Sequence, residues 1–229
     1  MILAPDKEAG PMFQSGIAPT GLTALFRSLD DSLRHILWRI ELALFAALLV
    51  LFNLPLLFGG FSTRCIFHLA AVHAGEWWRV LTHPFVHVSW YHLVLDAAAF
   101  FLAYTELQHR RLGSRLALVT AAGAGSLIAA IVASPLVATH GLCGLSGVAH
   151  GLTAVVALET LRRSDDKLFR WGGLLCFVGV VGKGVWEAIA GNVLFASWHL
   201  GSLGTPIAAC HAGGILGTLT IWLVFARKN

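Results

Sequence analysis

Six long apolar stretches decide what this chain can fold into. They cover residues 36–58, 88–107, 115–134, 144–161, 171–191 and 206–226 of the 229-residue sequence. Most of them approach the roughly 20 residues that a helix needs to cross about 30 Å of hydrocarbon. Helices are the expected form, because the open edges of a sheet find no hydrogen-bond partners in lipid. The pattern therefore predicts an all-α membrane protein with six transmembrane helices.

The composition agrees with a chain that lies mostly in lipid. Hydrophobic residues make up 57% and charged residues 12% of the sequence, whereas a soluble domain carries about 25% charged residues. The net charge is +4, but the basic residues stand between the apolar stretches rather than in one patch, so we expect no nucleic-acid partner. The four cysteines lack the spacing of metal ligands, so we expect neither a disulfide framework nor a thiolate metal site.

The basic residues also predict the topology. If all six stretches span, thirteen of the sixteen Lys and Arg residues fall on one side of the membrane. The exceptions are Arg64 and Arg79, in the loop of residues 59–87, and Lys183, inside the fifth stretch. Because positive residues are retained on the cytoplasmic side, both termini are expected in the cytoplasm.

The ends of the proposed membrane domain are also predicted from composition. Residues 1–35 have no signal-peptide pattern and are expected to form a cytoplasmic N-terminal tail with an amphipathic segment. Residues 36–229 are expected to form one six-span domain. Its long first loop is rich in aromatic residues, including Trp77 and Trp78, and is expected at the outer interface, where such rings settle.

Polar residues inside the apolar stretches are the candidates for chemistry. A charge at the middle of a spanning helix costs roughly 2.5 to 3.5 kcal/mol, so each one needs a reason. The polar groups of this kind are His83, His87 and His92 with Asp96, Ser146 with His150, Lys183 with Glu187, and His211.

Ser146 and His211 are predicted to lie at similar depth, just below the outer surface. Gly147 and Gly151 give one helix a small face, and Gly214 with Gly217 gives another to the helix of His211. Such faces let helix backbones approach closely, which a short serine side chain needs to reach an imidazole at about 2.6 to 3.2 Å. We interpret the pair as nucleophile and base. The alternative is that each residue merely packs within its own helix.

These residues resemble the motifs of a known family. Gly144-Leu145-Ser146-Gly147 is similar to the G-x-S-G nucleophile motif of rhomboid intramembrane serine proteases, and His211 with Gly214 is similar to their H-x-x-G base motif. The segment 76–79 resembles the family's E-x-W-R loop motif, and the histidines 83, 87 and 92 resemble its histidine series. Residues 144–151, and Lys183 with Trp186 and Glu187, look most like the rhombosortase branch, whose substrates carry a C-terminal sorting helix containing Gly-Gly.

The resemblance implies a six-span rhomboid-like bundle that cleaves membrane-anchored proteins near the outer face. Ser146 and His211 would form the catalytic dyad without any cofactor or metal, and Gly144 would belong to the nucleophile loop. The backbone N–H of Ser146 and the His92 side chain would stabilise the oxyanion. The expected location is a bacterial inner membrane, in contact with the lipid bilayer and a membrane-anchored substrate, while the oligomeric state stays open.

Two positions depart from the family pattern. Asp96 stands where many rhomboids have asparagine, and His150 stands where many have tyrosine. We expect Asp96 to be either protonated, and so a hydrogen-bond donor, or paired with a histidinium or with Lys183. His150 lies one turn from Ser146 and competes with His211 as the base, although we favour a supporting role.

The remaining polar residues have structural and functional interpretations. Lys183 and Glu187 are spaced as a buried ion pair that holds their helix, or as a pair that recognises substrate. His83 and His87 are expected to organise the loop around Pro84.

Two rival functions stay open from the sequence. A zinc-dependent membrane hydrolase would use His83, His87 and His211 as ligands with Asp96 nearby. A non-enzymatic haem-binding protein would use two histidines as axial ligands.

Overall fold

The computed structural model describes residues 21–109, 111–194, 196–198 and 200–227. In this part of the chain the secondary structure is helical, apart from one isolated bridge between Phe67 and Leu142. The first part of the expected N-terminal tail, residues 1–20, lies outside the described residues. The long helices are α1 (Gly21–Asn53), α4 (Trp90–Glu106), α5 (Leu112–Ala133), α7 (Ser146–Arg163), α8 (Lys167–Ala190) and α9 (Ala209–Ala226).

Short helices fill the connections between the long ones. The first of them, η1 (Leu54–Phe58), follows α1 directly, and the long first loop holds η2 (Thr63–Cys65), α2 (Leu69–His73), α3 (Arg79–Thr82) and η3 (His83–Phe85). Two more, α6 (Leu136–His140) and η4 (Ala196–Trp198), precede α7 and α9.

The first helix is longer than the sequence pattern predicts. The expected amphipathic segment and the first spanning stretch are one continuous helix, because no proline or internal glycine interrupts α1 before Asn53. Pro55 then starts η1, and Gly59 ends it in the left-handed conformation with φ 76°. The expected boundary between tail and domain, at residues 35 and 36, therefore lies inside a helix.

Four described helices are long and apolar enough to cross a membrane. They are residues 36–58, α5, α8 and α9. A fifth span results if the segment Arg79–Phe85 is joined to α4, from which it is bent by 94°. The 18 residues of α7 fall short, because they include His150 and end with Glu159, Arg162 and Arg163. The chain is thus an all-helical membrane bundle, and the count of six spans stays a prediction.

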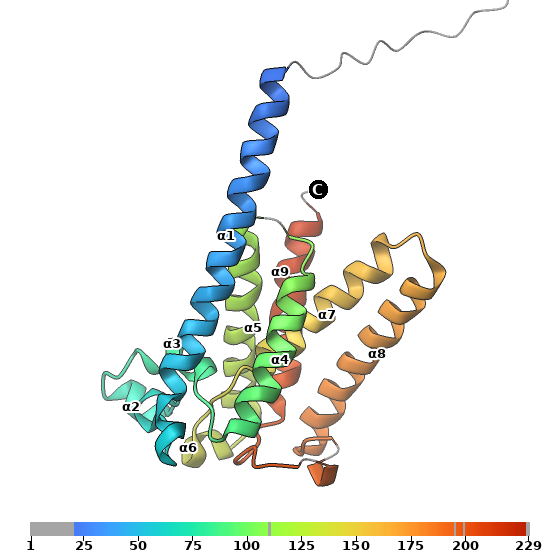
Figure 1. Cartoon of the computed structure of the whole chain (residues 1–229). Helices are drawn as coiled ribbons and strands as arrows, with labels where there is room; N and C mark the ends of the chain where they lie inside the picture. Colours follow the sequence, from blue (N-terminus) through green and yellow to red (C-terminus); the bar gives the residue numbers. More distant parts are fainter. Residues whose placement is uncertain (1–20, 110, 195, 199, 228–229) are drawn as a thin grey trace, which may run out of the picture.

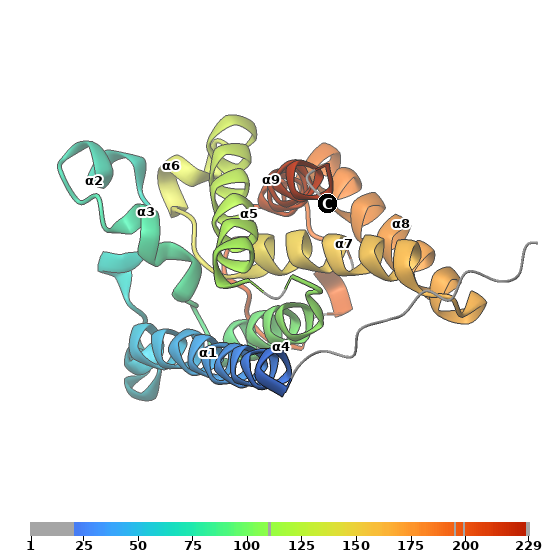
Figure 2. The same cartoon turned by 90° about the horizontal axis from the view of Figure 1, so that it is seen from above.

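The helix that carries Ser146 lies at the centre of the bundle. Seen from above, α7 runs between α4 on one side and α5 with α9 on the other, and α8 also packs on α7 (Figure 2). The helix α1 lies outside and packs on α4. Buried apolar side chains of α1, α4, α5, α7 and α9 form the main core, which includes Phe45, Phe100, Leu118, Leu152 and Trp222.

The two ends of the bundle differ in what they hold. The start of α1 and the end of α9 lie at one end, and the short helices α2, α3 and α6 lie at the other (Figure 1). At the first end, the Glu41 carboxylate binds Arg115 and accepts a hydrogen bond from the Tyr104 hydroxyl at 2.6 Å. This buried network ties α1, α4 and α5 together.

The first loop is held together by its own contacts and is joined to the segment before α7. The buried Arg79 side chain donates to the carbonyls of Thr63 and Ile66 at 2.8 and 2.7 Å and pairs with Glu76. Phe67 and Leu142 exchange two backbone hydrogen bonds, which join the loop to the segment before α7. Trp77 and Trp78 stay 67% and 49% exposed, as rings in a headgroup layer would be.

Candidate active site

The predicted site residues gather around one cavity of about 860 Å³ near the loop end of the bundle. The cavity is lined by parts of α4, α7, α8 and α9 and by the segments that precede α7 and α9. Its lining includes His92, Asp96, Ser146, His150, Lys183 and His211. Six residues that are up to 119 positions apart in the sequence therefore share one space.

Ser146 is the first residue of α7 and stands on a tightly packed turn. Gly144, two residues before it, has φ 101°, a conformation that favours glycine. Its N–H donates to the His83 carbonyl at 3.0 Å, and a Cβ there would lie 2.8 Å from the His92 Nε2. The backbone N–H groups that begin a helix lack intrahelical partners and attract negative charge. Ser146 therefore stands where a developing anion is favoured.

Close contact between α7 and α9 brings Ser146 and His211 to the same cavity. A Cβ on Gly214 would collide with the Gly147 carbonyl oxygen, and one on Gly151 would collide with Thr218 and lie 2.5 Å from the Gly214 carbonyl oxygen. The expected close approach of the two helices is confirmed. Gly217 is different, because it faces Ala121 of α5 rather than α7.

The Ser146 hydroxyl contacts the residue next to His211. Its Oγ lies 3.8 Å from the Cys210 Sγ, and among the described residues no hydrogen bond joins it to the His211 ring itself. Cys210 is buried and also lines the cavity. The sequence gives this cysteine neither disulfide nor metal-ligand spacing, and only its position directly before His211 could have drawn attention to it.

Both ring nitrogens of His150 are occupied. Its Nδ1 lies 2.7 Å from the Ser146 carbonyl oxygen, which can only accept, so Nδ1 carries the hydrogen and donates. Its Nε2 lies 2.9 Å from the Lys183 Nζ, and an ammonium can only donate. The His150 ring is therefore neutral, and it stacks on the His211 ring at 4.0 Å with an angle of 12°.

Glu187 stands behind His211 and is completely buried. Its Oε2 lies 2.6 Å from the His211 Nδ1, and its Oε1 accepts from the Leu194 N–H at 2.8 Å. Lys183 pairs with the same carboxylate at 2.8 Å, a contact that agrees with the ion-pair interpretation of their spacing on α8. The contact between Glu187 and His211 was not foreseen, because the two residues lie 24 positions apart and on different helices.

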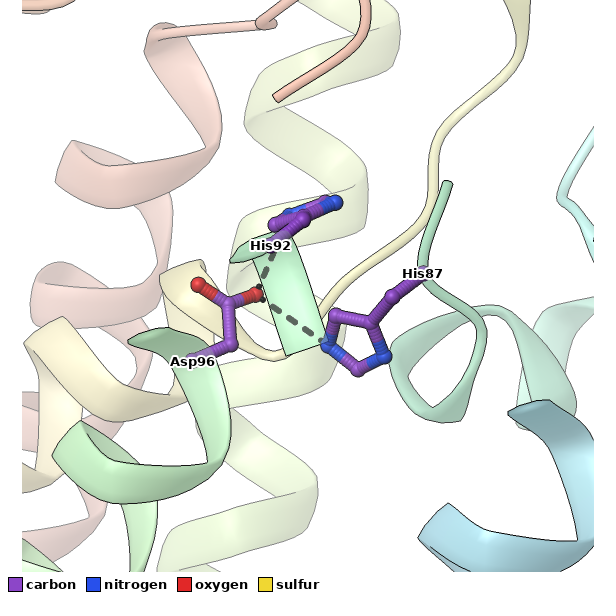
Figure 3. Close-up of side chains that lie close together, drawn as sticks. All are labelled: His87, His92 and Asp96. Carbon is purple, nitrogen blue, oxygen red and sulfur yellow. Dashed lines mark ion pairs between the residues drawn. The ribbon is translucent and has the colours of Figure 1, made fainter. Parts of the chain in front are cut away.

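A second cluster contains His87, His92 and Asp96 (Figure 3). The Asp96 Oδ2 lies 3.4 Å from the Nε2 of His87 and 3.3 Å from the Nε2 of His92. Asp96 thus faces two histidines and not Lys183, which binds Glu187 and His150. Both ring nitrogens of His87, the Nδ1 of His92 and the Oδ2 of Asp96 are buried without a well-oriented hydrogen bond among the described residues.

His83 lies outside both clusters. Its Nδ1 is 3.0 Å from the Val80 carbonyl oxygen and 3.2 Å from that of Arg79, so its ring fastens the turn before α4. The zinc ligand set expected from the sequence, His83 with His87 and His211, is therefore not assembled. Within the described part of the chain, two other sets have the spacing of metal ligands, with their ligating atoms within 4.8 Å of one another: His87, His92 and Asp96, and His150, Glu187 and His211.

Comparison with known proteins identifies the family of this chain. Residues 74–227 match the model of the Rhomboid domain. The chain belongs to the rhomboid family. The matched residues include both histidine clusters and Ser146, whereas α1 precedes them.

One curated relative is similar over part of this region. The protein named "Putative rhomboid protease YdcA", from Bacillus subtilis (strain 168), is 34% identical over 93 residues, which are 40% of this chain. The matched segment spans 45% of that relative's length. No solved structure matches the chain significantly.

Proposed function

We propose that this chain is an intramembrane serine protease that cuts membrane-anchored proteins near the outer face of the membrane. The observation that carries the proposal is the shared cavity of Ser146 and His211, in a chain of the rhomboid family. The serine begins a helix, and the histidine has its Nδ1 engaged by a carboxylate. This arrangement suits a nucleophile and its general base.

The reaction uses the ring nitrogen of His211 that does not face Glu187. Its Nε2 accepts the proton of the Ser146 hydroxyl as Oγ attacks the carbonyl carbon of the substrate peptide. The C–N bond then breaks, the amine leaves with the proton from His211, and an acyl-enzyme stays on Ser146. Water, or another nucleophile, then releases the acyl group and restores the hydroxyl.

The oxyanion is stabilised by donors at the start of α7 and by His92. The N–H of Ser146 belongs to the unpaired first turn of the helix, and His92 lines the same cavity with an unpartnered Nδ1. As a histidinium, His92 pairs with the Asp96 carboxylate through its Nε2–H, and its Nδ1–H is then the donor to the oxyanion. Losing one donor of this kind costs roughly 10² to 10³ in rate.

The substrate is a transmembrane helix that enters beside α8. A second cavity of about 600 Å³ lies between α4, α7 and α8. Its lining is apolar and contains small residues, among them Ala99, Gly172 and Gly173, and small residues let a foreign helix approach closely. The motif at residues 144–151 and the Lys183–Glu187 pair favour the rhombosortase branch, with C-terminal Gly-Gly sorting helices as substrates and a bacterial inner membrane as the site of action.

This function includes the six-span arrangement with both termini in the cytoplasm. The basic residues at positions 111–115 and 162–170 support it, since each lies in, or within about one helical turn of, the connection α4–α5 or α7–α8. The candidate site then lies on the outer side, at the end of the bundle that holds α2 and α6.

A metal-dependent hydrolase is the second candidate, and one observation favours it. His87, His92 and Asp96 offer two imidazoles and a carboxylate within 4.8 Å, with nitrogens that lack good hydrogen bonds. Two histidines and an acid are a common donor set for catalytic zinc. In that case the ion would lie beside His92 rather than beside His83.

One experiment separates the two functions. The protein purified in detergent is treated with a fluorophosphonate, and labelling is compared with that of Ser146→Ala, with and without the chelator phenanthroline. We expect labelling of the wild type alone, unchanged by the chelator, with cleavage of a transmembrane substrate following the same pattern. Cleavage that survives Ser146→Ala and stops with the chelator would instead establish the metal-dependent reaction.

A further inference from the structure

Three glutamates are buried inside the bundle, and only one of them contacts a proposed catalytic residue. Glu41, Glu159 and Glu187 are 5%, 2% and 0% exposed. Glu41 binds Arg115 and Tyr104, and Glu159 binds the Trp222 indole and the Gln108 N–H. These two join helices near the end of the bundle opposite Ser146. Glu187 binds His211 instead.

The contact between Glu187 and His211 fixes the tautomer of the ring. A carboxylate oxygen accepts hydrogen bonds, so the hydrogen in the 2.6 Å contact belongs to the His211 Nδ1. In the neutral ring the Nε2 is then the acceptor, which is the form a general base needs. The carboxylate also faces the imidazolium that forms when His211 takes a proton, and it stabilises that charge.

Glu187 is itself held in place by two further donors. The Leu194 N–H and the Lys183 ammonium each lie within 3 Å of the carboxylate. Lys183 compensates the buried negative charge in the resting state, so the carboxylate avoids the cost of an unpaired ion. The same ammonium occupies the Nε2 of His150, which keeps that ring from accepting the proton of Ser146.

We infer that Glu187 positions the catalytic base, so that Ser146, His211 and Glu187 act together as a triad. Lys183 anchors the carboxylate and confines His150 to a supporting role as the ring stacked on His211. The inference rests on the proposed function, because it assigns Glu187 a role only if His211 is the base. The triad consists of side chains of this chain alone.

The test compares three variants of buried glutamates. Glu187→Gln removes the charge and keeps the size, Glu187→Asp keeps the charge on a shorter side chain, and Glu159→Gln is the matched control at the other end of α7. Turnover of a transmembrane substrate is measured per active site, with sites counted by fluorophosphonate labelling. We expect Glu187→Gln to lower kcat by about 10² to 10⁴-fold with KM changed less than about threefold.

The controls separate positioning from folding. Glu159→Gln is expected to lower the unfolding temperature and keep kcat per active site, whereas Glu187→Asp recovers at least tenfold over Glu187→Gln. Wild-type kcat in Glu187→Gln would overturn the inference. If that variant does not fold, Glu187→Asp decides, since wild-type kcat in it together with a lowered unfolding temperature indicates a structural role only.

Failure of the proposed function gives a different result. If Ser146→Ala still cleaves the substrate, the serine mechanism is wrong whatever Glu187 does. If Ser146→Ala is inactive and Glu187→Gln is as active as the wild type, the serine mechanism stands and the triad is wrong.

Discussion

Two clusters in this molecule contain the same three groups, two imidazoles and one carboxylate, and they differ in how their atoms are satisfied. In the cluster of His150, Glu187 and His211, the carboxylate contacts His211, Lys183 and the Leu194 N–H, and Lys183 also contacts His150, all at 2.6 to 2.9 Å. In the cluster of His87, His92 and Asp96, the contacts to the carboxylate are 3.3 and 3.4 Å, and several buried nitrogens lack good partners.

The difference indicates different tasks. A saturated network fixes one tautomer and one orientation for each ring, which suits a base that must be ready before substrate arrives. A network with free donors is suited to a charge that exists only during the reaction, such as an oxyanion. Buried polar atoms without partners are rare in native proteins and call for an explanation of this kind. Substitutions in the two clusters should therefore act differently.

The largest effect is expected from His211→Ala. Removing the base should lower turnover by about 10⁴-fold or more and abolish fluorophosphonate labelling of Ser146. The matched variant is His150→Phe, which keeps a stacked ring and removes both of its hydrogen bonds. It should keep turnover within about tenfold. Labelling that survives in His211→Ala and is lost in His150→Phe would move the base to His150.

The next effect is expected from Asp96→Asn. The carboxylate faces two imidazole Nε2 atoms, and we expect it to hold His92 as an oxyanion donor through a charged contact. Replacing it by the amide should lower kcat by about 10 to 10²-fold with little change in KM. Steady-state kinetics on one substrate check this. Near wild-type kcat would show instead that a neutral donor suffices, the other interpretation open from the sequence.

Lys183→Met should mainly change stability. It leaves Glu187 buried beside His211 without its ammonium partner, and breaking a buried ion pair is costly. Because Lys183 is 29% exposed, we expect a loss of about 2 kcal/mol rather than the full cost of a buried charge. Thermal unfolding in detergent measures the loss. The double variant Lys183→Met with Glu187→Gln should be more stable than Lys183→Met alone, and a strictly additive result would count against the pairing.

Much of the fold can be predicted from the sequence, because a helix needs roughly 20 mostly apolar residues to cross the bilayer. The helices α4, α5, α7, α8 and α9 lie within a few residues of the expected stretches. The pattern fails where the rule does not apply. Hydropathy marks where the spanning stretch begins, at residue 36, but it does not show that the amphipathic part belongs to the same unbroken helix, and the central α7 is too polar to pass a test for spanning helices.

The candidate site, too, could be predicted from the sequence only in part. Ser146 and His211 stand in short motifs, and their depth follows from helix order, so their shared cavity was predictable. The partners Cys210 and Glu187 were not, because a contact between two helices depends on how each is rotated about its axis. A spacing of four residues predicts the pair Lys183–Glu187, but it does not tell which neighbouring helix the carboxylate faces.

The smallest effect on turnover is expected from His87→Leu. This variant tests whether the buried nitrogens without good hydrogen bonds in the cluster of His87, His92 and Asp96 mark a metal site. Both ring nitrogens of His87 are buried without a well-oriented partner, and its backbone N–H keeps its bond to Asn53 whatever the side chain is. His87→Leu removes two poorly satisfied buried nitrogens, which offsets the loss of the long 3.4 Å contact with Asp96, and that carboxylate keeps its contact with His92. The kcat should therefore stay within about threefold, and the unfolding temperature should change little. The same replacement at His92 should lower kcat more, because that ring lines the cavity.

The second measurement is the zinc content of both variants and of the wild type, determined by elemental analysis. If His87→Leu abolishes turnover and removes a bound equivalent of zinc, the cluster is a metal site and the hydrolase with a metal ion at His87, His92 and Asp96 is the better description of this chain.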